Sequence, residues 1–197
     1  MRSRALRLGA ALLLCALAAC RTAPLTFPAI APWEVRRPLL QARANFDLRG
    51  RVAVATGSQG FNANLHWAQK GERSHLTLAG PLGSGAVEVN AAGHELDIAT
   101  ASGEHLDNAA ARAELAARLG FDPPLASLRF WILGVPDPST PATERLDAQR
   151  QRLQGLTQAG WHIDYAQYVA VGPDWLPARL TLERDTVRVR LLVDEWQ

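Results

Sequence analysis

Apolar and polar side chains alternate along two long stretches of this chain, and this period of two limits the fold more than any other feature. Between residues 46 and 54, Phe, Leu, Gly, Val and Val occupy every second position, with Asp, Arg, Arg and Ala between them. Residues 61–67 repeat the pattern. Because successive side chains of a strand point to opposite faces, each stretch predicts a strand with one apolar face.

Shorter strands of the same character follow, separated by turns that contain glycine. They are predicted at 75–79, 86–90, 95–99, 151–157, 161–168, 178–183 and 187–193. We therefore expect about nine to eleven strands, arranged as an antiparallel meander with one buried face.

The segment between the two groups of strands is helical in character. One helix is predicted from an Asn108 cap to Leu119, with Gly120 ending it. A second is predicted over 125–133, between Pro123-Pro124 and Gly134, and is apolar all round except at Arg129. Such a helix must be enclosed or must line something apolar. The fold class is therefore mainly β with inserted helices (α+β).

The N-terminal residues predict export and lipidation. Three arginines precede an apolar run of about 12 residues, which is shorter than the roughly 20 that a membrane span needs. The run ends in Leu17-Ala18-Ala19-Cys20, the lipobox pattern of bacterial lipoproteins. We expect residues 1–19 to be a cleaved signal peptide, Cys20 to carry the lipid, and 20–32 to form a Pro-rich tether.

Residues 33–197 are then expected to form a single domain, beginning with a helix at 33–44 that breaks at Pro38. Arg21 stands where an Asp would resemble the signal for retention in the inner membrane. The expected location is therefore the outer membrane of a Gram-negative bacterium, with the domain facing the periplasm.

Charge and cysteine content exclude several classes of protein. Cleavage removes three of the 21 basic residues and leaves the 19 acidic ones, so the formal balance falls from +2 to −1. This balance gives no support for a nucleic-acid partner. Cys15 leaves with the signal peptide, and Cys20 is used by the lipid, so no disulfide is expected.

No catalytic or metal-binding pattern emerges from the remaining residues. The five histidines show no metal-ligand spacing, and no serine sits in a nucleophile elbow. The glycines of 80–85 lack the lysine and the helix of a phosphate-binding loop. The absence of these patterns favours a binding protein, for which we expect no cofactor.

Apolar side chains occur in two notable settings. Six tryptophans stand in a chain with only 7% aromatic residues. Trp67, Trp131 and Trp161 are expected to face inward, either as ordinary core or as the wall of an apolar cavity suited to acyl chains. Leu82 lies at the tip of a predicted hairpin, where it is either a single exposed leucine or a probe that enters a bilayer.

These features stand within a longer set of motifs. They read Leu48-Arg49-Gly50, Trp67-Ala68-Gln69, Gly80-Pro-Leu-Gly-Ser84, Val87-Glu-Val-Asn-Ala91, Leu125-Ala-Ser-Leu-Arg-Phe-Trp-Ile-Leu-Gly-Val-Pro136, Gly160-Trp161 to Tyr165, Leu176-Pro177-Ala178 and Asp194-Glu195-Trp196. With them the chain resembles the outer-membrane lipoprotein LolB family from the lipobox to its last residues. The stretch 125–136 with the preceding Pro-Leu-Gly turn is the most specific part.

The resemblance implies a half-open antiparallel β-barrel of about eleven strands, with a helical lid over an apolar cavity. It implies no enzyme activity and no metal. It implies a monomeric acceptor that takes triacylated lipoproteins from the periplasmic carrier LolA and inserts them into the outer membrane. Cys20 would carry the lipid, and Pro81, Leu82 and Gly83 would form the membrane-insertion loop. Our hypothesis for the acyl-chain cavity comprises Trp67, Val89, Phe130, Trp131, Leu133 and Tyr165. Arg49 is a candidate for docking or gating.

Two departures from the family pattern affect these expectations. The surface is rich in arginine and nearly free of lysine, which affects the docking charges, and Phe130 would make the cavity more apolar. The alternative is a structural outer-membrane lipoprotein with a packed core and no ligand, which the interior volume would distinguish. A periplasmic hydrolase would need a catalytic cluster that the sequence does not show.

Overall fold

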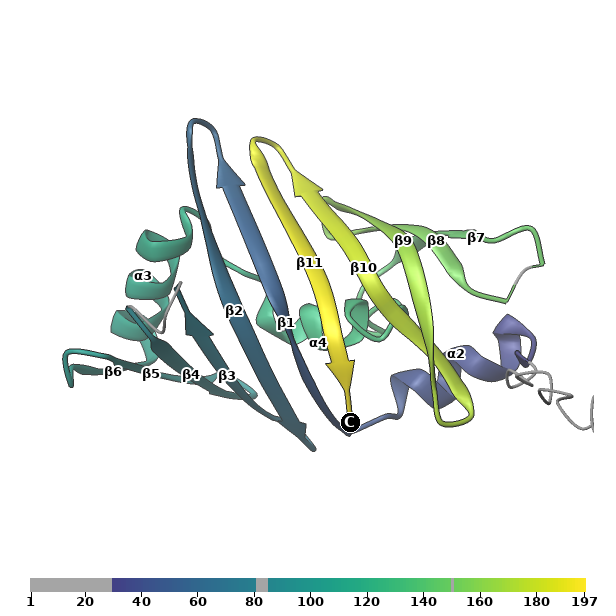
Figure 1. Ribbon diagram of the computed structural model, residues 1–197, viewed down its shortest axis with the longest axis horizontal. Coiled ribbons are helices and arrows are strands. Elements are labelled where there is room, and N and C mark those ends of the chain that lie inside the picture. Colours follow the sequence, from purple (N-terminus) through teal and green to yellow (C-terminus); the bar gives the residue numbers. More distant parts are fainter. Residues whose placement is uncertain (1–29, 81–84, 150) are drawn as a thin grey trace, which may run out of the picture.

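The fold is one curved antiparallel sheet with helices on one side (Figure 1). The computed structural model describes residues 30–80, 85–149 and 151–197. Eleven strands follow the order β6-β5-β4-β3-β2-β1-β11-β10-β9-β8-β7. Their bounds are β1 Asn45–Thr56, β2 Gln59–Lys70, β3 Arg73–Ala79, β4 Val87–Ala92, β5 Glu95–Thr100, β6 His105–Asp107, β7 Ala142–Leu146, β8 Leu153–Gln158, β9 Trp161–Val171, β10 Asp174–Arg184 and β11 Val187–Trp196.

The strand order joins two meanders through the first and last strands of the chain, β1 and β11. β1 to β6 form one half and β7 to β11 the other, and β1 pairs with β11 in the middle. The connection between the halves carries helices α3 (Asn108–Leu119) and α4 (Leu125–Trp131). Figure 1 shows α4 behind the central strands β1 and β11 and α3 beside β5. The fold class predicted from the sequence is therefore confirmed.

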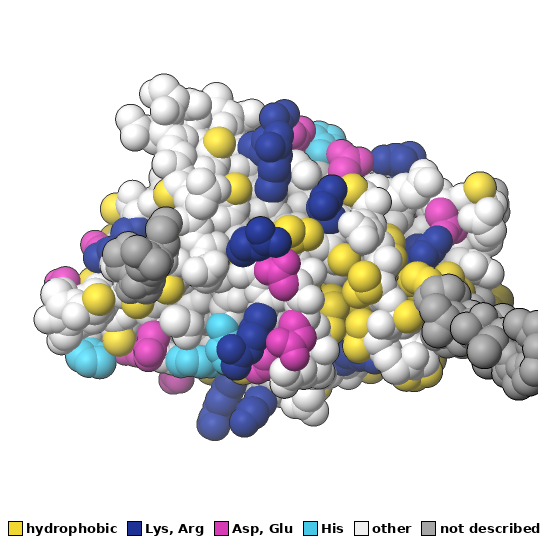
Figure 2. Space-filling model, in the orientation of Figure 1, with side chains coloured by type: hydrophobic (Ala, Val, Ile, Leu, Met, Phe, Trp, Pro, Cys, Tyr) yellow, Lys and Arg dark blue, Asp and Glu magenta, His cyan; other side chains and the backbone are white. Residues whose placement is uncertain are grey.

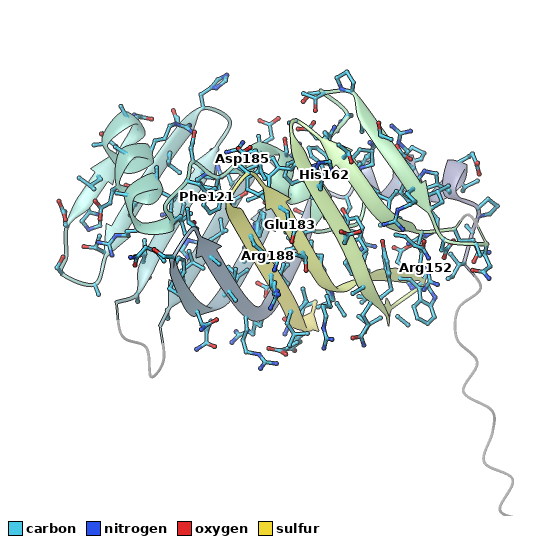
Figure 3. All side chains as sticks on the ribbon, turned by 90° about the horizontal axis from the view of Figure 1, so that it is seen from above. Phe121, Arg152, His162, Glu183, Asp185 and Arg188 are labelled. Atoms are coloured by element: carbon cyan, nitrogen blue, oxygen red, sulfur yellow. The ribbon has the colours of Figure 1, made fainter. Side chains whose placement is uncertain are left out.

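The predicted alternation corresponds to the inner and outer faces of the sheet. Phe46, Leu48, Gly50 and Val54 of β1 are buried, whereas Arg49 and Arg51 are exposed. The outer face carries ion pairs between neighbouring strands, such as Glu183 with Arg188 (Figure 3). The inner face is apolar because it must pack against the helices.

Three local features differ from the sequence-based expectations. α2 (Trp33–Gln41) continues through Pro38, where a break was predicted. Pro38 and Glu34 are both exposed, so water can satisfy the Glu34 carbonyl that loses its helical donor. Asp107, and not Asn108, is the N-cap of α3, although Gly120 ends that helix in the left-handed conformation as predicted. β6 and β7 were missed because they are short and do not alternate clearly.

Gly50 lies against the backbone of β11, at an irregularity in the pairing of β1 with β11. The pairing register shifts between Arg49 and Gly50, which marks a β-bulge. A Cβ atom on Gly50 would lie 2.3 Å from the Leu192 carbonyl oxygen. The two halves can therefore join at this point only through a glycine.

Candidate functional site

An apolar cavity lies between the inner face of the sheet and the inserted helices. Its volume is about 110 Å³, and both halves of the sheet contribute to its wall. Every lining residue is apolar. They are Val52, Val54, Phe61, Leu65, Trp67, Leu76, Leu78, Val89, Leu115, Leu119, Phe121, Pro123, Pro124, Leu125, Leu128, Trp131, Ile132, Trp161, Leu180, Leu182, Val189 and Leu191. Such a wall suits a ligand that is itself a hydrocarbon.

Three aromatic rings meet at the β9 side of this cavity. The Trp161 ring centroid lies 6.3 Å from that of Trp131 and 5.6 Å from that of Phe121. The Arg184 guanidinium lies over the Trp161 ring, 4.6 Å from its centroid. In the described part of the chain, Trp161 Nε1 is the one buried side-chain polar atom without a hydrogen-bond partner. These three rings therefore provide a large apolar contact surface for a ligand, with few polar atoms.

The C-terminal end of α4 is fixed to the sheet by buried hydrogen bonds. Trp131 Nε1 donates to Gln158 Oε1 at 2.7 Å, and Tyr165 OH donates to the Trp131 carbonyl at 2.9 Å. Gln158 Oε1 also accepts from the Asp137 backbone N–H at 2.9 Å, and its Nε2 donates to the Asp137 and Thr140 carbonyls. Because these groups are buried and paired with one another, separating them is costly.

Asp137 extends this network to the middle of α4. Its carboxylate accepts the Ser127 hydroxyl at 2.7 Å and the Ser139 N–H and hydroxyl at 2.8 and 2.7 Å. Burial alone raises the pKa of this carboxyl, but these hydrogen bonds and the nearby charge of Arg129 outweigh it and leave the pKa below its ordinary value. The ionised form of Asp137 therefore stabilises the folded state.

The opposite side of the cavity is held more weakly. α3 buries only Ala111 and Leu115. Its end is linked to β1 by a single long hydrogen bond, from Thr56 Oγ1 to the Leu119 carbonyl at 3.4 Å. Figure 3 shows Phe121 between α3 and the β10–β11 end of the sheet. If one wall of the cavity moves, α3 and the segment through Pro124 have fewer side-chain hydrogen bonds to break than the end of α4.

The structure brings together half of the residues proposed for the cavity. Trp67, Val89 and Trp131 lie on its wall. Phe130, Leu133 and Tyr165 are buried but do not line it. Phe130 faces the other side of α4, under the Arg129 guanidinium, and Tyr165 holds the end of the helix.

Several wall residues were missed by the sequence reasoning. Leu115, Leu119, Phe121 and Leu128 come from the inserted segment. A helix that is apolar all round gives no signal for which face meets the cavity, and α3 offers a thin stripe. The spacing of Leu128 and Trp131 with Leu125 was the available indication of a shared face.

The remaining proposed residues lie elsewhere. Cys20 and the loop residues Pro81, Leu82 and Gly83 lie outside the described residues. Arg49 is exposed on the outer face of β1, with His66 of β2 and Glu195 of β11 as its register partners. Within the described ranges, no group of three or more His, Cys, Asp or Glu side chains could hold a metal ion. No helix among these residues is long and apolar enough to cross a membrane.

The curved sheet, inserted helices and apolar interior define the class of protein. The chain resembles the solved structure of a DUF1329 family protein from Desulfovibrio piger, with a TM-score of 0.56 at 7% identity, over 83% of this chain and 89% of that one. It also resembles a LolA superfamily protein from Nitrosomonas europaea, with a TM-score of 0.53 at 8% identity, over 85% and 93%. These likenesses establish a LolA-type fold.

Sequence comparison narrows this class to one family. The family model described as outer membrane lipoprotein LolB matches residues 44–196. The outer-membrane lipoprotein LolB of Nitrosococcus oceani is 32% identical over 165 residues, which cover 84% of this chain and 82% of the relative. The chain belongs to the outer-membrane lipoprotein LolB family, which confirms the predicted family and the predicted location at the outer membrane.

Proposed function

We propose that this protein receives lipoproteins from a LolA-like periplasmic carrier, holds their acyl chains in its cavity and inserts them into the outer membrane. The observation that carries the proposal is the wholly apolar cavity between the sheet and the inserted helices of a LolB-family chain. The sequence contains no nucleotide-binding loop. Transfer would therefore be driven by a higher affinity of this protein than of the carrier for the acyl chains. The proposal includes no catalytic step and no cofactor.

The cavity must expand to hold an acyl chain. Its volume is about 110 Å³, whereas an engineered apolar cavity of roughly 150 Å³ holds one benzene molecule. We propose that α3 and the segment through Pro124 move outward, while Trp131, Gln158 and Tyr165 keep the C-terminal end of α4 in place. Trp67, Val89 and Trp131 would touch the chains, and Phe130, Leu133 and Tyr165 would support the fixed end.

The alternative is a structural lipoprotein whose core takes no ligand. An empty volume of about 110 Å³ costs roughly 3 kcal/mol in a core that could otherwise be filled. The more weakly held helix α3 also forms part of the cavity wall, through Leu115 and Leu119. Both observations favour binding over a purely structural role.

A displacement assay tests the cavity. A fluorescent fatty acid is titrated into the mature chain carrying Cys20→Ser, and an unlabelled fatty acid displaces it. Val54→Phe places a ring in the cavity and is expected to weaken binding at least about tenfold, because the new ring and the acyl chain compete for the same space. Val187→Phe is the matched control, because Val187 is buried but does not line the cavity. Absence of saturable binding by the Cys20→Ser protein would refute the cavity proposal.

A transfer assay tests the acceptor role. The lipidated protein in vesicles is mixed with a lipoprotein-charged carrier, and appearance of the lipoprotein in the vesicle fraction is followed. We propose that Cys20 anchors the protein and that the loop of Pro81, Leu82 and Gly83 enters the bilayer. Leu82→Glu should then accept lipoprotein normally but insert it more slowly, because a carboxylate is costly in hydrocarbon. Normal insertion by this variant would remove the loop from the mechanism.

Arg49 is proposed to help dock the carrier on the outer face of the sheet. In the same assay Arg49→Glu should slow acceptance and leave fatty-acid affinity unchanged, because Arg49 is exposed and remote from the cavity wall. An unchanged acceptance rate at low salt would exclude this role.

A further inference from the structure

Helix α2 has an exposed apolar face opposite the face that packs against the rest of the protein. Its buried face carries Trp33, Arg36 and Leu40. Its outer face carries Val35, Pro38 and Leu39. With the C-cap residue Ala42 they follow the spacing of one helical stripe, and all four are exposed. Val35 is 51% exposed and Leu39 67%, and they are the large hydrophobic side chains that the described residues leave exposed. An exposed apolar stripe opposite a buried charge calls for a partner on the outer face.

The buried charge fixes which face points outward. Arg36 donates to the Gln151 carbonyl at 2.5 Å and to the Trp175 carbonyl at 2.8 Å. Trp33 Nε1 donates to Glu144 at 2.6 Å. Rotating α2 to bury its aliphatic stripe would break these bonds and strand a buried guanidinium. The outward position of Val35 and Leu39 is therefore a property of the docked helix.

Among the charged side chains of α2 and the residues just after it, Glu34 is the one that is exposed without an ion pair in the described part of the chain. Arg37 pairs with Glu144 at 3.1 Å, and Arg43 pairs with Asp174. Figure 2 shows hydrophobic side chains gathered toward the end of the molecule where α2 lies. A surface of this kind suits an apolar partner better than a charged one.

The number of residues between Cys20 and α2 limits how far α2 can lie from the lipid anchor. Pro32, directly before α2, stands 12 residues after Cys20, and a chain of that length spans at most about 40 Å. No other described element lies so close in sequence to the proposed anchor. We infer that the outer face of α2, with Val35 and Leu39 at its centre, rests on the lipid surface that holds the anchor. This inference depends on the proposed lipidation of Cys20.

The contact would orient the protein. Two aliphatic side chains give a weak association by themselves, but the anchor already keeps them at high effective concentration near the bilayer. A modest preference is then enough to hold one end of the sheet against the membrane. Because the stripe is apolar, the contact should not depend on anionic lipid or on salt.

A single-label experiment tests the contact. In the mature lipidated protein the Cys20 thiol is consumed, so Leu39→Cys provides the one free thiol for an environment-sensitive fluorophore. The labelled protein is placed in phosphatidylethanolamine–phosphatidylcholine vesicles, with and without phosphatidylglycerol and with doxyl-labelled lipid as quencher. The matched control is Thr186→Cys, an exposed position in the β10–β11 turn, at the other end of the strands from α2 (Figure 1).

The expected result is a blue shift and quenching at position 39, unchanged by phosphatidylglycerol or salt, and neither change at position 186. No change at position 39 in protein that floats with the vesicles overturns the inference while leaving the anchor intact. A change that needs added carrier assigns the stripe to a protein interface and overturns it as well. Equal changes at positions 39 and 186 would show unspecific adsorption to the vesicles and would also overturn the inference. Failure of the protein to float, as the Cys20→Ser form must fail, refutes the anchor and this inference together.

Discussion

Gly50 sets the tightest residue-scale constraint in the sheet. We predict that Gly50→Ala lowers the free energy of unfolding by at least about 2 kcal/mol, because its Cβ would meet a backbone oxygen that cannot rotate away. The control is Gly155→Ala, whose Cβ would meet only the end of the flexible Arg145 side chain. We expect that variant to lose less than about 1 kcal/mol. Urea titration of both variants measures the difference, and equal losses would contradict the argument.

Asp137 gives a prediction that depends on pH. Its pKa is lower in the folded state, so its carboxylate stabilises the protein above the ordinary pKa of an aspartate, and this contribution disappears as the pH falls through the folded-state value. Asp137→Asn should cost about 2 kcal/mol at pH 7. The gap between wild type and variant should narrow below about pH 4.

Chemical denaturation at pH 7 and pH 3 checks this prediction. Asp185→Asn is the control, because Asp185 lies exposed in the β10–β11 turn and its left-handed backbone accepts asparagine. A gap for Asp137→Asn that stays constant with pH would show that the loss comes from altered packing and not from the charge.

For single residues, the sequence predicted whether a side chain points into the protein, but it did not predict which residues that side chain contacts. The inward direction of Trp67, Trp131 and Trp161 follows from strand alternation and from an all-apolar helix. The sequence does not show that Trp131 lines the cavity while its neighbour Phe130 does not, because both residues are apolar and buried. Only the pairing of Trp131 with Gln158, 27 residues away, fixes which one turns toward the cavity.

At the scale of elements, α3 and α4 differ in how firmly they are attached. We predict that amides of 108–119 exchange with deuterium faster than those of 130–137, because α3 buries only the side chains of Ala111 and Leu115 whereas the end of α4 lies in a buried hydrogen-bond network. Saturating fatty acid should slow exchange mainly in α3. Mass-spectrometric exchange on the Cys20→Ser protein tests this. Faster opening at 130–137 would reverse the proposed entry route.

Element boundaries were predictable wherever a local signal was strong. Gly120 ends α3, and the long alternating strands fall close to their predicted ranges. β6 and β7 are sheet edges of three and five residues whose pairing depends on β5 and β8, so local sequence carried little information about them. Pro38 is tolerated because tertiary contacts of Arg36 and Leu40 hold α2 on both sides of it.

For the whole molecule, an open sheet must protect two edges. β6 has only three residues, and α3 follows it directly along the chain and packs beside it. β7 carries a bulge between Arg145 and Leu146 and is held from α2 through Glu144, which contacts Trp33 and Arg37. Short, bulged or covered edges limit pairing with other chains. This arrangement supports the expectation that the protein is a monomer.

Removing the buried charge of α2 should expose one of these edges. Arg36→Met keeps the aliphatic stem but loses the bonds to the Gln151 and Trp175 carbonyls. We predict a loss of about 2–4 kcal/mol in unfolding free energy and self-association that grows with concentration, because α2 detaches and frees β7. Arg51→Met, which removes an exposed pair with Asp194, should leave the unfolding free energy nearly unchanged and stay monomeric. For the Cys20→Ser forms of both variants, urea titration measures the unfolding free energy. Light scattering during size-exclusion chromatography measures their self-association. If Arg36→Met is destabilised yet monomeric at every concentration, the edge is protected by β7 itself and the role assigned to α2 is wrong.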